Sequence, residues 1–199
     1  MMAKVYEIDN IKPVINPSTF VHPDAVLIGD CIVGANCYIG PYACLRGDFG
    51  RIEIADGCNV QDHCVIHTSP ELDTYLEENA HVGHGAILHG CTIKHNALIG
   101  INSVVMDGAI IGINSFVASM SFVKLGFFVP DNVLVAGSPA EIARELTEKE
   151  IKRKTEGTSL YKQLAVRSIE SMRKVQPLTR VEVDRKRFDH FSIDEYRNR

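Results

Sequence analysis

Several features are scarce or missing in this chain of 199 residues, and their scarcity limits what the protein can be. Tryptophan is absent, which by itself excludes nothing. None of the six cysteines forms a Cys-x-x-Cys pair, and in an intracellular chain they are expected to stay reduced. No run of about 18 apolar residues occurs, so no membrane span is expected. The opening residues, MMAKVYEIDN, lack the apolar segment of a signal peptide, and the cytoplasm is therefore the expected compartment.

An excess of positive charge is also lacking. The formal net charge is −4 and the isoelectric point is about 6.1, which argues against a nucleic-acid binder that relies on phosphate attraction. Apolar residues make up 45% of the chain and charged residues 23%. That composition is typical of a globular protein with one good core or two small ones.

An apolar residue recurs every six positions through most of the chain. The period is interrupted by a three-residue insertion before residue 54 and by a longer loop, TSPELDTYLEEN, before residue 82. Every position of the series is Ile, Leu or Val: Val21, Leu27, Val33, Ile39, Leu45, Ile54, Val60, Ile66, Val82, Leu88, Ile93, Ile99, Val105, Ile111, Val117 and Val123. A period of six fits neither an amphipathic helix nor a simple alternating strand.

A second position of the same repeat carries small residues. Four places after the apolar residue usually stand Ala, Ser, Thr or Cys, and Phe49, before the insertion, breaks the rule. We therefore expect four of the cysteines, Cys31, Cys37, Cys58 and Cys64, to lie inside the structure as small buried residues rather than as ligands or redox groups. Cys44 and Cys91 fall outside the pattern.

The repeat predicts short parallel strands joined by tight corners, with three hexads in a triangular coil of about eighteen residues. It resembles the hexapeptide repeat of left-handed parallel β-helices, and the handedness rests on that resemblance. The pattern ends after Val123. A turn at residues 137–139 is followed by a predicted helix, which Thr147 and Glu150 would begin as a capping box. We expect a β-helix domain over 1–139, a helical segment over 140–175 and a charged, loosely ordered tail over 176–199.

An apolar stripe marks the predicted helix and requires a partner surface. That surface is either a face of the β-helix or a neighbouring subunit. The stripe consists of Leu160, Leu164, Val166, Ile169 and Met172.

Counting three hexads per coil places two histidines side by side. Leu45, Ile66 and Leu88 stack on successive coils, roughly 4.8 Å apart. The residues that follow them, Arg46, His67 and His89, therefore form an outward column in which the two imidazoles are placed to share a metal ion. The remaining histidines are expected to be scattered over the surface: His22, His63, His81, His95 and His190.

A second polar column lies on the neighbouring face and contains Asp62 and His84. One chain cannot easily bring His84 to His67 and His89, but a symmetric neighbour can. In a homotrimer, His84 of one copy would complete a three-histidine site on the next, and Arg46 would pair with Asp62 across the interface. Three histidines and an open position are typical of a catalytic zinc site, where the pKa of the bound water falls to near 7.

The segments LRGD, NVQD, VIH and GHGAILHG, within residues 45–90, resemble the γ-class carbonic anhydrase family of hexapeptide-repeat proteins. The resemblance implies a homotrimer that binds zinc or iron through the same three histidines. It also implies an active-site pair at Asn59 and Gln61, interface contacts by Arg46 and Asp62, and a further interface acid at Asp48. Longer stretches, among them FVHPDAVLIGD and GSPAEIARELTEKE, resemble the phenylacetate-degradation and carnitine-operon branches of the family.

The departures from the γ-class pattern bear on the reaction. Two glutamates that assist proton transfer in the γ-class enzymes are replaced by Phe49 and Pro70, and Glu71 is out of register. This argues against fast CO₂ hydration. The main hypothesis is therefore a metal-dependent thioesterase that hydrolyses acyl-CoA thioesters, in phenylacetate or other aromatic catabolism, with Gln61 assisting at the carbonyl oxygen.

Three other functions remain open on the sequence. The same metal site would support reversible CO₂ hydration. A hexapeptide acyltransferase would use a histidine base without a metal. A trimeric scaffold would keep the site only as a remnant. Zinc and iron are both acceptable to three neutral imidazoles.

Overall fold

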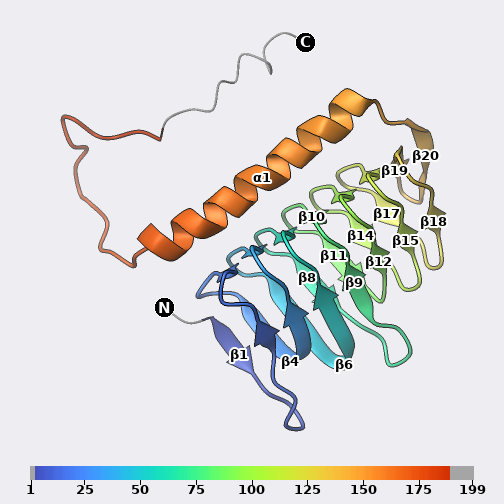
Figure 1. Ribbon diagram of the computed structural model, residues 1–199, viewed down its shortest axis with the longest axis horizontal. Coiled ribbons are helices and arrows are strands. Elements are labelled where there is room, and N and C mark those ends of the chain that lie inside the picture. The colour runs from blue at the N-terminus through green and yellow to red at the C-terminus, as the bar shows by residue number, and fades with distance from the viewer. Residues whose placement is uncertain (1–2, 189–199) are drawn as a thin grey trace.

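The computed structural model describes residues 3–188 and shows a coiled parallel sheet of about seven turns with one long helix beside it (Figure 1). This is the left-handed parallel β-helix that the repeat predicts. The strands are β1 (Lys4–Tyr6), β2 (Val14–Ile15), β3 (Phe20–Val21), β4 (Val26–Val33), β5 (Tyr38–Ile39), β6 (Cys44–Ile54), β7 (Asn59–Val60), β8 (Val65–His67), β9 (Thr74–Leu76), β10 (His81–Val82), β11 (Ile87–His89), β12 (Thr92–Ile93), β13 (Leu98–Ile99), β14 (Val104–Val105), β15 (Ile110–Ile111), β16 (Phe116–Val117), β17 (Phe122–Val123), β18 (Phe128–Val129), β19 (Val133–Gly137) and β20 (Ala140–Glu145). The helix is α1 (Glu148–Ser171).

The coil has three faces. The histidine face consists of β1, β8, β11, β14, β17 and the first halves of β4 and β6. The loop face consists of β2, β9, β12, β15, β18 and the second halves of the same two long strands, which bend around the corner between the faces. The helix face consists of β3, β5, β7, β10, β13, β16 and β19, with β20 added as an antiparallel strand at its end.

The repeated apolar residues fill the interior, as the sequence predicts. Leu45 pairs with Ile66, and Ile66 with Leu88, and all three side chains are fully buried. Four cysteines expected inside, at positions 31, 37, 58 and 64, belong to the same core. Burial raises the pKa of the Cys31 thiol to about 11, so it stays protonated at neutral pH.

Glycine is needed where successive coils come closest. A Cβ atom on Gly112 would lie 2.5 Å from the carbonyl oxygen of Pro130, on the next coil. Asparagine rather than glycine occupies many of the left-handed corner positions, and the side chains of Asn96, Asn114 and Asn132 form a ladder of hydrogen bonds 2.8 and 2.9 Å long.

The coil continues beyond Val123, where the strict repeat ends, within the expected β-helix domain of 1–139. Val129 and Val135 keep the period of six and are fully buried. Phe127 and Val133 stand in the positions that small residues occupy elsewhere, which is why the strict repeat ends at Val123. The segment after the turn also differs from the expected helical region of 140–175, because its first residues form β20 before α1 begins.

The start of α1 is the capping box that the sequence predicts. The hydroxyl oxygen of Thr147 accepts a hydrogen bond from the backbone N–H of Glu150, and the Glu150 carboxylate accepts one from the N–H of Thr147. The helix then runs back along the coil toward its first turns (Figure 1). Residues 176–188 form no helix or strand, and the remainder of the charged tail, with His190, lies outside the described residues.

The apolar stripe of α1 does not provide its contact with the coil. Leu160, Val166, Ile169 and Met172 are exposed in the single chain, so four of the five residues do not pack on the β-helix, and packing on a neighbouring subunit stays a prediction. Short or polar side chains face the coil instead, and they let the helix approach closely. The buried ones are Lys154, Thr158, Ala165 and Ser168.

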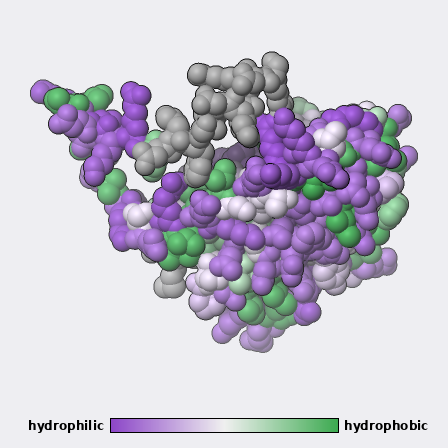
Figure 2. Space-filling view, turned by 45° about the horizontal axis from the view of Figure 1, so that its top comes forward, coloured by the Kyte–Doolittle hydropathy of each residue, from purple (hydrophilic) through white to green (hydrophobic). Residues whose placement is uncertain are grey.

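Hydrophobic residues are dispersed over the face of the molecule that Figure 2 shows. In Figure 2 the visible face is mainly hydrophilic, with hydrophobic residues in separate small patches. Within residues 3–188, no helix combines the length and apolar character needed to cross a membrane.

Candidate functional site

The column of Arg46, His67 and His89 forms as the repeat predicts. These residues are Cα partners on adjacent strands β6, β8 and β11. Each follows an inward-facing residue, so the three side chains project from the histidine face at its corner.

The two imidazoles face each other directly. The Nδ1 atom of His67 lies 3.1 Å from the Nε2 atom of His89, and the ring centroids are 5.1 Å apart. Two nitrogens bound to one tetrahedral zinc at about 2.05 Å would be roughly 3.3 Å apart. The spacing of this histidine pair therefore fits two ligands of one shared ion.

Carboxylates hold the outer nitrogen of each imidazole. Asp48 Oδ1 is 2.9 Å from His67 Nε2, and Asp107 Oδ1 is 2.7 Å from His89 Nδ1. Arg46 also approaches His67 Nε2, at 3.0 Å, and its Nε atom lies 3.8 Å from Asp48. Asp48, to which the resemblance gives an interface role, thus contacts the histidine pair within its own chain.

His84 stands apart from the pair, on the other polar column. Its Nδ1 atom is 2.5 Å from the Asp62 carboxylate, and both side chains are partly exposed. In the described part of the chain, no group of three or more His, Cys, Asp or Glu side chains is arranged to hold a metal ion. One copy therefore brings together two of the three predicted ligands, and the pairing of Arg46 with Asp62 stays a prediction about an interface.

Asn59 and Gln61 lie on the helix face and are buried. The Gln61 Nε2 atom donates a 3.0 Å hydrogen bond to Asn59 Oδ1 and lies 2.6 Å from His81 Nε2. The ring of Tyr161, on α1, packs edge-on against His81. Within one chain, these two predicted active-site residues are thus near the His84 column and are not part of the histidine pair.

Sequence reasoning missed two of these residues. Asp107 was not considered; Leu88 pairs with Val105, so Asp107 stands on the next coil, one place beyond the position level with His89. His81 was assigned to the surface, but it is partly buried and its Nδ1 atom is buried without a hydrogen-bond partner. Burial, with the nearby charge of Lys154, lowers the pKa of His81 to about 3. The assignments of His63 and His95 to the surface are confirmed, and His22 is partly buried.

Other features surround the histidine pair. The ring of Phe49, itself largely exposed, has its centroid 5.3 Å from that of His67. An apolar ladder lies beside the histidine column on the histidine face, and three of its four side chains are exposed. It consists of Val65, Ile87, Val104 and Phe122, which are Cα partners on successive coils.

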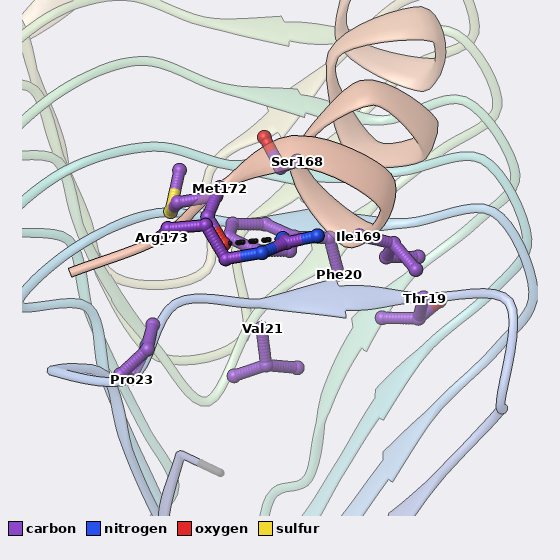
Figure 3. A pocket seen from close by; sticks show the side chains of 8 residues that line it. All are labelled: Thr19, Phe20, Val21, Pro23, Ser168, Ile169, Met172 and Arg173. Carbon is purple, nitrogen blue, oxygen red and sulfur yellow. Dashed lines mark hydrogen bonds between the residues drawn. The ribbon is translucent and has the colours of Figure 1, made fainter. Parts of the chain in front are cut away.

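A pocket of about 550 Å³ lies elsewhere, between β3 and the last turn of α1 (Figure 3). Arg173 lies across it, and its guanidinium donates a 2.8 Å hydrogen bond to the carbonyl oxygen of Met172. Five of its eight lining residues are apolar, and none belongs to the histidine pair. The residues that line it are Thr19, Phe20, Val21, Pro23, Ser168, Ile169, Met172 and Arg173.

The chain is similar to several known proteins. Residues 12–47 match the family model described as bacterial transferase hexapeptide (six repeats). The carnitine operon protein CaiE of Salmonella agona is 50% identical over 182 residues, which is 92% of each chain.

Solved structures with the same fold are also similar in sequence. A candidate acetyltransferase of Bacillus cereus is 38% identical, with a TM-score of 0.82 over 82% of this chain and 95% of that one. A hexapeptide transferase family protein of Anaplasma phagocytophilum is 34% identical, with a TM-score of 0.79 over 83% of this chain and 98% of that one.

Proposed function

This chain belongs to the CaiE family of hexapeptide-repeat proteins, and from that premise we propose that it is an enzyme acting on acyl-CoA thioesters. The observation that carries the proposal is the pair of His67 and His89 with a carboxylate on the outer nitrogen of each ring. A histidine oriented by a carboxylate is the usual arrangement for removing a proton from an attacking nucleophile.

Acyl transfer is the reaction that the relatives favour. The matched family model is described as a transferase, and the Bacillus cereus relative is described as a candidate acetyltransferase. In this reaction an amine or hydroxyl attacks the thioester carbonyl carbon, and its proton passes to His89 Nε2. The carbon–sulfur bond then breaks, and the CoA thiolate leaves and takes up that proton.

Hydrolysis of the same thioester is the second candidate, and the spacing of the histidine pair favours it. The 3.1 Å between the facing nitrogens fits two ligands of one zinc or iron ion. Such an ion, when bound, would act as a Lewis acid and lower the pKa of a water molecule. Water is then the acceptor, while Asp48 and Asp107 keep the two imidazoles oriented. Phenylacetyl-CoA and related aryl thioesters are the substrates we propose for this branch.

A homotrimer would complete the site in either case. The apolar ladder exposes Val65, Ile87 and Phe122 beside the histidine column, and burying such a surface stabilises association. A second copy on this face would bring His84 and the nearby Gln61 toward His67 and His89.

CO₂ hydration is the third candidate, and the contact between Phe49 and His67 disfavours it. Fast hydration exports a proton at every turnover, and a phenyl ring cannot carry one. The same ring is suited to contact an acyl chain.

Thiol release from acetyl-CoA and phenylacetyl-CoA tests the proposal. It is measured with and without a panel of primary amines and alcohols, together with the zinc and iron content of the protein. We expect release to fall by about 100-fold or more in His89→Ala, and to be unchanged in His95→Ala, which alters an exposed histidine.

The acceptor dependence separates the two reactions. Release without an acceptor supports hydrolysis, whereas release that requires an acceptor and yields its acyl derivative supports transfer. A folded, metal-loaded protein that releases no thiol under any of these conditions would overturn the proposed function.

A further inference from the structure

Asp107 lies in the corner between β14 and β15, one coil beyond His89. Its Oδ1 atom is 2.7 Å from His89 Nδ1, and its side chain is only 16% exposed. A carboxylate at this distance and with this little water around it makes a strong, charge-assisted hydrogen bond.

The contact fixes where the proton of His89 sits. An ionised carboxylate only accepts hydrogen bonds, so Nδ1 of His89 carries the hydrogen and donates it to Asp107. In the neutral ring the other nitrogen, Nε2, then carries a lone pair. That lone pair is directed at His67, whose Nδ1 atom is 3.1 Å away.

The backbone is built to keep Asp107 in place. Gly90 directly follows His89, adopts a left-handed conformation with φ +51°, and donates its N–H to the carbonyl oxygen of His67, 3.2 Å away. Its carbonyl oxygen accepts a 2.7 Å hydrogen bond from Gly108, the residue after Asp107. A Cβ atom on residue 90 would lie 2.5 Å from Asp107 Oδ1, so only glycine leaves room for the carboxylate.

We propose that Asp107 is a positioning residue that holds His89 in the tautomer whose Nε2 lone pair binds a divalent metal ion between His89 and His67. The inference rests on the hydrolysis candidate of the proposed function, in which His67 and His89 bind a metal, and not on the transfer candidate, in which the same lone pair accepts a proton. Carboxylates that accept from the far nitrogen of a ligand histidine orient the ring and raise its affinity for the metal.

The affinity for zinc alone is the first test, measured by competition with a chromogenic chelator. We expect Asp107→Asn to weaken zinc binding by about 10- to 100-fold, since the amide keeps the shape but loses the charge. Asp131→Asn is the matched control. Asp131 also sits in a corner and accepts a 2.7 Å hydrogen bond, but from the backbone of Ile113 and not from a histidine. This control should bind zinc as the unchanged protein does.

The tautomer of His89 is the second test, and it needs neither a variant nor a metal. Nitrogen-15 NMR of histidine-labelled, metal-free protein should show His89 protonated at Nδ1. The opposite tautomer, zinc binding unaffected by Asp107→Asn, or no zinc binding by the unchanged protein would each overturn the inference. Tight zinc binding that depends on Asp107, without any release of thiol from acyl-CoA, would overturn the proposed function and leave the inference standing.

Discussion

At the scale of single residues, His81 determines how the helix face responds to acid. Its Nε2 atom contacts Gln61, its ring contacts Tyr161, and its Nδ1 atom is buried without a partner. Protonation of this ring would create a positive charge that is shielded from water and close to Lys154. Burial is therefore the main cause of a pKa near 3, compared with 6.5 for an ordinary histidine.

We predict that the protein loses stability between pH 6.5 and about 3 because of His81. In this range the unfolded chain binds a proton that the folded chain excludes, so stability falls as the pH falls. His81→Gln, whose carbonyl oxygen can still accept from Gln61, should show a flatter decline of the unfolding free energy, measured in urea at several pH values. His95→Gln is the control at an exposed site, and it should keep the slope of the unchanged protein. Equal slopes for all three proteins would contradict the prediction.

Single residues also show where sequence reasoning was sufficient. Stacking the repeat placed Arg46, His67 and His89 correctly, because register in a coil is fixed by the buried residue next to each. The burial of His81 was not predictable. It depends on the helix that covers this face, and nothing in the hexad around residue 81 indicates which face that helix will choose.

At the scale of elements, α1 is attached to the coil through a buried lysine. The Nζ atom of Lys154 donates hydrogen bonds of 2.6 Å to the carbonyl oxygen of Asn79 and 2.8 Å to Asn96 Oδ1. Burial lowers the pKa of this amine from 10.5 to about 7, while the nearby thiol of Cys58 raises it and Lys162 lowers it further. The hydrogen bonds of this lysine therefore attach the helix to the coil at a position where the apolar stripe makes no contact.

We predict that Lys154 makes the folded state more stable as the pH rises from about 7 to 10.5. In this range the unfolded chain still holds the proton that the folded chain has lost, so raising the pH favours folding. The free energy of unfolding should rise by on the order of 3 kcal/mol over the range. Lys154→Met should lack this gain, as measured by denaturant unfolding at pH 7 and pH 10. Lys149→Met, at an exposed position of the same helix, should retain it. A gain in Lys154→Met equal to that of the unchanged protein would refute the assignment.

The elements were predicted unevenly. The capping box at Thr147 and Glu150 is a local signal, and it located the start of the helix correctly. The strict repeat could be followed only to Val123, because Phe127 and Val133 fill positions that are small elsewhere. The stripe that includes Leu160 and Ile169 indicated a helix but not its partner, since amphipathic patterning cannot distinguish a covered face from one left exposed.

At the scale of the whole molecule, the proposed three-histidine site requires that two copies cooperate. Each chain offers a face with His67 and His89 and a separate corner with His84. A site that uses all three histidines can form only where two copies meet. Mixing two variants can therefore test whether the site is shared.

We predict that two defective variants restore each other's metal site. His67→Ala and His84→Ala should each bind little zinc, but co-refolded in equal amounts they should recover about one quarter of the normal content, because random assembly joins one intact face to one intact corner at that frequency. Zinc per chain is measured by atomic emission, and assembly mass by light scattering. The control mixture joins His67→Ala with His89→Ala, whose defects lie on the same face, and it should recover nothing. A lack of recovery in the first mixture would exclude a shared site.

The reversed direction of β20 has a consequence for how molecules meet one another. A stack of parallel strands ends in an open row of backbone donors and acceptors, onto which another coil can add, as in a growing fibre. Here the row of the helix face pairs with β20, which runs antiparallel, carries the exposed charges of Glu141, Arg144 and Glu145 and cannot continue the parallel register, whereas β17 and β18 end the other two faces. Addition along the axis is thus hindered at one of three edges, and the proposed shared site would need copies to meet at their flanks instead.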